Sequence, residues 1–150
     1  MAIDFVTEDG TGKEDATSYI SLIDFEQYWE NRGKTFSDSD NAIKVKLNIA
    51  TQYVDYLHIY KGSKSTAEQA LQFPRTIEPG TIPAVVKNAV CEAAAYELNG
   101  NSLETATQPI QSKRMGPVSV TYGSRGQQPP KLTIVEKFLG GLVEQMGVSR

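Results

Sequence analysis

The stretch AIKVKLNIATQYVDYLHIY, residues 42–60, is the longest periodic segment of the chain and decides its fold class. Its apolar residues recur every three or four positions, which places them on one face of an α helix. They are Ile43, Leu47, Ala50, Tyr53, Val54, Leu57 and Tyr60. Ser37 lies upstream as a candidate N-cap, with acidic residues in the turn that follows it. We therefore predict a long helix over residues 42–60, with its N-cap at Ser37 and a stop at Gly62.

Outward from this segment, the same spacing predicts three more helices. The first begins after Ser21, which can form a capping box with Asp24, and stops at Gly33. The next takes Pro83 as its first residue and ends at Asn99-Gly100. The last begins near Thr133 and runs to Met146. We expect a mainly α fold, a small bundle of three main helices.

The segment between the last two helices changes its period. Val118, Val120 and Tyr122 alternate with polar residues, the pattern of a half-buried strand. Gly116-Pro117 indicates a turn before them, so a short β-hairpin is predicted over residues 110–122. One domain then accounts for the chain, divided into an N-terminal arm (1–17), a helical core (18–100), a linker with the hairpin (101–130) and a C-terminal amphipathic helix (131–150).

Composition narrows the function classes. The 150 residues include 39% hydrophobic ones, with no uninterrupted apolar run of about 18–20 residues, so we expect no membrane association. The single cysteine and the absence of a signal-peptide pattern predict a protein that works in a reducing cytoplasm or in a structure assembled there. Fifteen basic against 18 acidic residues give a net charge of −3, whereas proteins that bind phosphates usually carry a basic surplus.

Groups with catalytic potential are few. One histidine, His58, and one cysteine, Cys91, cannot supply the three or four ligands of a usual zinc site. We interpret His58 as a residue within the long helix that packs or faces water, and Cys91 as a buried structural thiol. Phosphate-binding glycine loops are absent from the sequence. We predict that the protein is not an enzyme and needs no cofactor or metal.

Two groups of residues could bind nucleic acid. Tyr53, Tyr56 and Tyr60, near Lys61 and Lys64, could form a base-stacking platform. Alternatively, Tyr53 and Tyr60 belong to the core face and only Tyr56 is exposed, which we favour. A small basic cluster around the predicted hairpin could meet phosphates or an acidic partner surface; its members are Lys113, Arg114 and Arg125.

One set of motifs is more specific. Gln69-Ala70-Leu71-Gln72-Phe73-Pro74-Arg75 is followed by the helix start Ile82-Pro83 and later by Gly116-Pro117-Val118-Ser119-Val120-Thr121-Tyr122. This order, over nearly the whole chain from about Ser18, resembles a family of small bacteriophage proteins. Members are labelled DnaT-like single-stranded DNA-binding proteins, and they are also similar to the adaptor (head completion) proteins of the head–tail connectors of long-tailed bacteriophages.

The resemblance to connector adaptors implies a structural virion protein at the head–tail interface, assembled in the bacterial host cytoplasm. It implies a homo-oligomeric ring of twelve copies that joins the portal protein to a stopper or tail-terminator protein. Genomic double-stranded DNA would pass through the ring without sequence-specific contact. A ring subunit needs two different complementary surfaces and commonly offers flexible arms that order on assembly, which the N-terminal arm, hairpin region and C-terminal helix could supply. We favour this role for that reason, and because negative charge keeps a DNA channel from binding its cargo. The alternative is a DnaT-like single-stranded DNA-binding protein.

Two groups of residues follow as predictions. The expected interface lies on the hairpin region and the C-terminal helix, with Lys113, Arg114, Val118, Val120, Tyr122, Arg125, Phe138, Leu139, Leu142, Val143 and Met146. The expected structural motif comprises Gln69, Leu71, Phe73, Pro74, Arg75 and Pro83. Within it, Phe73 fills the core, Pro74 fixes the loop, and Arg75 binds helix-end carbonyls or a carboxylate. The alternative is that these residues contact a partner directly.

Overall fold

A computed structural model describes residues 3–103 and 132–144 of the chain. These residues form helices α1 (Leu22–Glu30), α2 (Asp40–Leu57), α3 (Ala84–Leu98) and α6 (Thr133–Leu139), followed by the short 3₁₀ helix η1 (Gly140–Leu142). Within the described ranges, β structure is limited to isolated bridges. The prediction of a mainly α fold is confirmed. The predicted hairpin over residues 110–122 lies outside the described residues.

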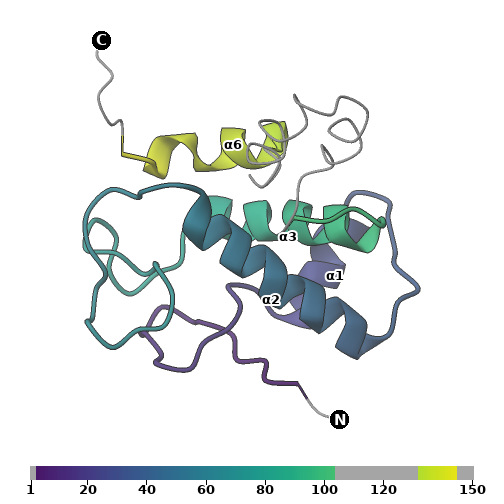
Figure 1. Ribbon diagram of the computed structural model, residues 1–150, viewed down its shortest axis with the longest axis horizontal. Helices are drawn as coiled ribbons and strands as arrows, with labels where there is room; N and C mark the ends of the chain where they lie inside the picture. The colour runs from purple at the N-terminus through teal and green to yellow at the C-terminus, as the bar shows by residue number, and fades with distance from the viewer. Residues whose placement is uncertain (1–2, 104–131, 145–150) are drawn as a thin grey trace, which may run out of the picture.

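Helix α3 is the centre of the fold. It contacts α1, α2 and α6, and Figure 1 shows α6 above it and α2 crossing in front of and below it. Its buried side chains are mostly small, with Ala89, Ala93, Ala94 and Ala95 among them. Small side chains let neighbouring helices approach closely, which explains how one helix supports three others.

The helix ends correct the sequence-based boundaries. Ser21 caps α1 as predicted, because its Oγ accepts a hydrogen bond from the backbone N–H of Asp24 at 3.1 Å. The cap of α2 is Ser39, whose Oγ accepts from the N–H of Ala42 at 3.2 Å, so the prediction of Ser37 is wrong. Ser39 is the extended residue directly before the first helical turn, the position that an N-cap requires.

The C-terminal boundary of the second helix and the start of the third also differ. Helix α2 ends at Leu57, and His58 is extended (φ −140°, ψ 166°), so His58 and Tyr60 lie beyond the helix and not inside it. Pro83 precedes α3 rather than forming its first helical residue. Its carbonyl accepts the first hydrogen bond of the helix, from the N–H of Val86 at 3.0 Å.

The C-terminal helix is part of the hydrophobic core, so the prediction that it is an appended element is wrong for the described residues. Val135 and Leu139 are fully buried, and α6 packs along α3. The α helix ends at Leu139, before Gly140-Gly141, and not at Met146. The following backbone pairs with the segment after α2: Lys61 N–H donates to Leu142 O at 2.9 Å, and Glu144 N–H donates to Ile59 O at 2.8 Å.

The N-terminal segment folds back onto the body rather than extending as an arm. The Glu8 carboxylate is buried and accepts hydrogen bonds from the backbone N–H groups of Gly10, Gly12 and Lys13, each at 2.8 Å. The Lys13 carbonyl in turn accepts from the N–H of Ala70 at 2.9 Å. These bonds join the N-terminal loop to the loop between α2 and α3.

Candidate functional site

The motif over residues 69–75 forms a buried loop that joins several segments. Gln69 donates its Nε2 to the carbonyls of Leu71 (2.8 Å) and Pro74 (2.9 Å), while its Oε1 accepts from the N–H of Thr66. Phe73 is buried between the rings of Tyr19 and Tyr60 in edge-on contacts. The prediction that Phe73 fills the core is confirmed.

Arg75 binds backbone carbonyls of the loop that follows α2, whereas the prediction named helix-end carbonyls or a carboxylate. Its Nε donates to Lys61 O at 2.8 Å, and its Nη2 donates to Gly62 O at 2.7 Å and to Tyr60 O at 3.2 Å. Its Nη1 donates to the Gln72 carbonyl and side chain. With 7% of its surface exposed, Arg75 holds together the loop after α2 and is not a contact group on the surface.

A second buried network was not foreseen from the sequence. Tyr19 Oη donates to Asp55 Oδ1 at 2.5 Å and accepts from the N–H of Phe73 at 3.0 Å, while Asp55 Oδ2 accepts from the N–H of Gln72. Burial raises the pKa of Asp55 to about 6, against the opposing effect of these hydrogen bonds. Tyr19, Asp55 and the adjacent pair Gln72-Phe73 are far apart in the chain, so no local sequence pattern predicts the network.

The tyrosine platform is not formed. Tyr53 and Tyr60 are buried in the core, whereas Tyr56 has 78% of its surface exposed. Tyr56 borders a hollow of about 310 Å³ whose other lining residues come from α2 and two loops. They are Ala16, Thr17, Asn48, Ile49, Thr51, Gln52, Asp55, Ala70 and Leu71. This lining contains a carboxylate and no lysine or arginine, so it offers no cation for a phosphate.

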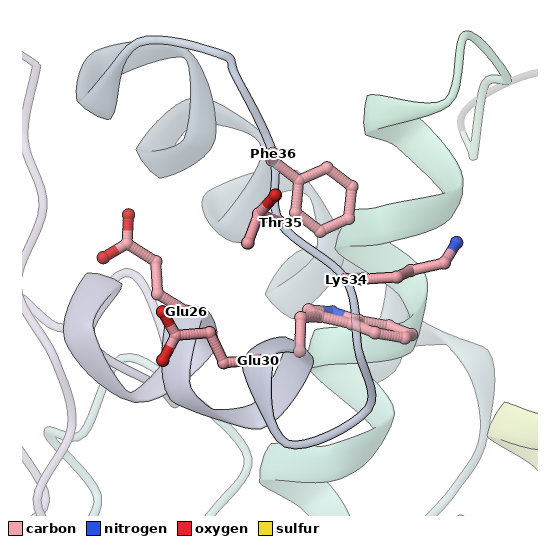
Figure 2. Close-up of a pocket in the computed structure, with 6 residues that line it drawn as sticks. Glu26, Glu30, Lys34, Thr35 and Phe36 are labelled. Carbon is pink, nitrogen blue, oxygen red and sulfur yellow. The ribbon is translucent and has the colours of Figure 1, made fainter.

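A smaller hollow of about 180 Å³ lies between α1 and the segment that follows it (Figure 2). Trp29 and Phe36 supply aromatic walls, with their rings edge-on at 6.2 Å. Glu26 and Glu30 project from α1 on the side of Thr35, whereas the Lys34 side chain extends to the opposite side (Figure 2). Its Nζ lies 5.6 Å from the centre of the Trp29 ring. We call this feature the α1 hollow.

Local sequence explains the α1 hollow. Gly33 has a positive φ of 78°, which lets the chain reverse so that the N–H of Lys34 donates to the Trp29 carbonyl at 2.8 Å. This turn brings Phe36 back over α1, in contact with Phe25 and Trp29. Trp29 is itself anchored, because its Nε1 donates to the Cys91 carbonyl on α3 at 3.2 Å. The Trp29 side chain that lines the hollow is thus held in place against α3.

His58 and Cys91 have structural surroundings. His58 Nε2 lies 2.7 Å from Glu136 Oε1, which links the segment after α2 to α6. Cys91 is buried, and this burial raises the pKa of its thiol well above the usual range, which disfavours the reactive thiolate. Within residues 3–103 and 132–144, no three histidine, cysteine or acidic side chains are grouped closely enough to hold a metal ion.

The predicted interface residues divide into two groups. Leu139 is fully buried, and Phe138, Leu142 and Val143 are partly buried against the core, so these four serve the chain's own packing. The others lie outside the described residues: Lys113, Arg114, Val118, Val120, Tyr122, Arg125 and Met146. The described helices include none with the length and apolar character to cross a membrane.

Comparison with known proteins gives one match. A family described as "Putative DnaT-like ssDNA binding protein" matches residues 3–150. No curated protein matches the chain. No solved structure matches it either. The match spans almost the whole sequence, including the buried loop over residues 69–75 and all four described α helices, and the chain therefore belongs to the DnaT-like family.

Proposed function

We propose that the protein is a non-enzymatic assembly subunit, the adaptor of a bacteriophage head–tail connector. In this role, copies form a ring that joins the portal to a stopper or tail-terminator protein, around the passage for genomic DNA. The proposed location is the virion, after assembly in the host cytoplasm. Family membership by itself does not distinguish this role from DNA binding.

The observation that carries the proposal is which aromatic side chains are buried and which are exposed. Binding of single strands relies on exposed aromatic rings beside basic groups. In the described residues, Tyr53, Tyr60 and Phe73 are buried, and the exposed Tyr56 borders a hollow lined by Asp55 and by no cation. An exposed ring among polar and apolar neighbours is better suited to protein contact than to phosphate-bearing chains.

Exposed apolar side chains on separate elements give further support. Ile23 on α1, Ile77 in the loop before α3 and Ile134 on α6 have 75%, 52% and 43% of their surfaces exposed. Closed rings need two different complementary surfaces on each subunit. The net charge of −3 also suits a subunit that surrounds DNA without binding it.

The test is made on phage particles. Deleting the gene should yield DNA-filled heads and separate tails that do not join, and supplying the wild-type protein should restore joining. Mass spectrometry of purified virions should find the chain in several copies per portal ring. If virions lack the protein and replication fails instead, the adaptor role is wrong.

Single-stranded DNA binding is the second candidate, favoured by the description of the family. It predicts binding to a 30-nucleotide oligomer that weakens steeply with added salt. Replacing Tyr56 with Ala should then weaken binding about tenfold or more, whereas Tyr56→Phe, which keeps the ring, should not. The adaptor role predicts that neither variant nor wild type binds the oligomer at physiological salt.

A further inference from the structure

The exposed face of α1 combines an exposed apolar side chain, two carboxylates outside the ion pairs of the described residues, and a hollow. Ile23, Glu26 and Glu30 recur at helical spacing and are all exposed. Directly beside them is the α1 hollow with its aromatic walls, Trp29 and Phe36 (Figure 2). An apolar side chain, two carboxylates and an aromatic hollow therefore share one surface.

The two carboxylates lack compensation. Glu26 and Glu30 are four residues apart on one helix face, where like charges repel and weaken the helix. None of the ion pairs among the described residues involves either of them. Lys34, four residues after Glu30, has its Nζ 5.6 Å from the centre of the Trp29 ring and forms no ion pair with Glu30. This repulsion would be relieved by cations from outside.

The chemistry of the hollow favours a guanidinium as one of these cations. Arginine stacks on aromatic rings and pairs with carboxylates through a planar group, so it matches both the walls and the carboxylates of Glu26 and Glu30. A hollow of about 180 Å³ is of the size of one side chain and smaller than ordinary small-molecule sites.

We propose that the α1 hollow receives Lys113-Arg114 of a second copy of this chain. This inference rests on the proposed ring assembly and names one of its contacts. The two arginines in the described residues are already engaged, Arg32 over the Tyr28 ring at 3.7 Å and Arg75 in the core. Lys113-Arg114 supplies two adjacent cations for two neighbouring carboxylates, with the arginine in the hollow and the lysine at its mouth.

Charge reversal tests the contact in the full-length protein. Sedimentation velocity should show that Glu26→Lys with Glu30→Lys weakens self-association at least tenfold, and that Lys113→Glu with Arg114→Glu does the same. Combining the four substitutions should restore self-association. The matched control is Glu14→Lys with Asp15→Lys, which reverses two exposed charges elsewhere and should change nothing. Circular dichroism verifies that each variant is folded, and Glu26→Gln with Glu30→Gln replaces any that is not.

A second measurement does not depend on ring formation. Trp29 is the only tryptophan of the chain and lines the hollow, so its fluorescence reports occupancy. A peptide of residues 110–118 should change this fluorescence in a saturable way, whereas the same peptide with glutamine at positions 113 and 114 should not. The effect should disappear in the Glu26→Gln, Glu30→Gln variant.

The outcomes separate this inference from the proposed function. If the peptide binds but no ring forms, the contact stands and the adaptor role fails. If rings form, and neither the reversals nor the peptide has an effect, the adaptor role stands and this contact is wrong. Loss of self-association without rescue in the four-fold variant, together with no peptide binding, also overturns the contact.

Discussion

At the scale of single residues, Arg75 makes the strongest case for a structural motif. Replacing it with Ala would leave the carbonyls of Tyr60, Lys61 and Gly62 without this donor, in a loop that is partly closed to water. We expect a loss of about 2–4 kcal/mol in the free energy of unfolding, measured by urea denaturation. Arg75→Lys should recover little of this, because an ammonium lacks the planar fork.

The control for Arg75 is Arg32. Arg32 is exposed and stacks on Tyr28, donating to the Tyr28 carbonyl at 3.0 Å. Arg32→Ala should therefore cost no more than about 1 kcal/mol. Equal losses for the two variants would show that Arg75 is not the organising residue of the loop.

The raised pKa of Asp55 predicts how the stability of the fold depends on pH. Its pKa rises from 3.8 to about 6 on folding because of burial, so between these values the folded chain holds a proton that the unfolded chain has lost. The stabilisation is complete below about pH 4 and is lost as the pH rises through about 6. The stability of wild type relative to Asp55→Asn should thus fall by about 2–3 kcal/mol from pH 4 to pH 7.

The Asp55 titration can also be observed directly. Carbon NMR of the carboxyl group should show a midpoint near pH 6, and Tyr19→Phe, which removes a hydrogen bond that lowers the pKa of Asp55, should move it higher. A midpoint near 4 would contradict the burial argument.

Residues of the 69–75 motif could be assigned from sequence because their roles are local. Arg75 reaches carbonyls that lie 13 to 15 residues earlier in the same loop region. Asp55 could not be assigned in this way. Its partner Tyr19 is 36 residues away, and only the packing of the N-terminal segment against α2 brings the two together.

At the scale of elements, substitutions in α6 test whether this helix belongs to the hydrophobic core. Leu139 is fully buried whereas Ile134, on the same helix, has 43% of its surface exposed. Leu139→Ala should reduce the free energy of unfolding by about 2–5 kcal/mol, and Ile134→Ala by less than about 1 kcal/mol. Denaturation curves that are equal for the two variants would mean that α6 is not docked in solution.

A substitution of the glycine after α6 should raise the stability of the fold instead of lowering it. Gly140 has helical angles (φ −53°, ψ −36°), and a Cβ there would meet nothing within 4 Å. Gly140→Ala should raise the melting temperature, with a gain of about 0.4–1 kcal/mol, because it restricts the unfolded chain. Gly62→Ala is the contrasting variant: φ is +78° and the new Cβ would lie 2.9 Å from Thr76 Oγ1, so stability should fall.

Helix positions were predictable, and their ends less so. Periodicity located α1, α2 and α3 because burial against a common core imposes a 3.6-residue repeat. It also extended α2 to Tyr60, because a buried aromatic at the right spacing looks the same in a helix as in the loop that follows. Tyr60 is in fact buried through its contact with Phe73 and its hydrogen bond to the Val54 carbonyl.

At the scale of the whole molecule, the N-terminal loop joins the body through Glu8. Glu8→Gln replaces one acceptor oxygen with an amide donor that faces backbone N–H groups, so we expect a loss of about 1–3 kcal/mol. Because this loop contacts Ala70 and Gly80, the variant should also be cleaved faster by protease within residues 64–80. Glu14→Gln, at an exposed position, should leave both properties unchanged.

The candidate surfaces depend on this whole-molecule folding, which limits what sequence could reveal. The apolar stripe of the C-terminal helix is equally compatible with an interface and with the chain's own core. The packing of α3 against α6, where Val135 and Leu139 are buried, shows that it belongs to the core. The α1 hollow was missed because Trp29 and Phe36 look like ordinary core residues. Its one local signal is Gly33, which reverses the chain over α1.

The central place of α3 has a consequence for how the molecule opens. Helices on several sides shield its amide groups, and its small side chains leave little room for water to enter. Deuterium should therefore replace the amide hydrogens of residues 88–96 last of all, at the rate of global unfolding. In the proposed ring assembly, a subunit would then be able to rearrange α1 or the N-terminal loop while α3 stays protected throughout.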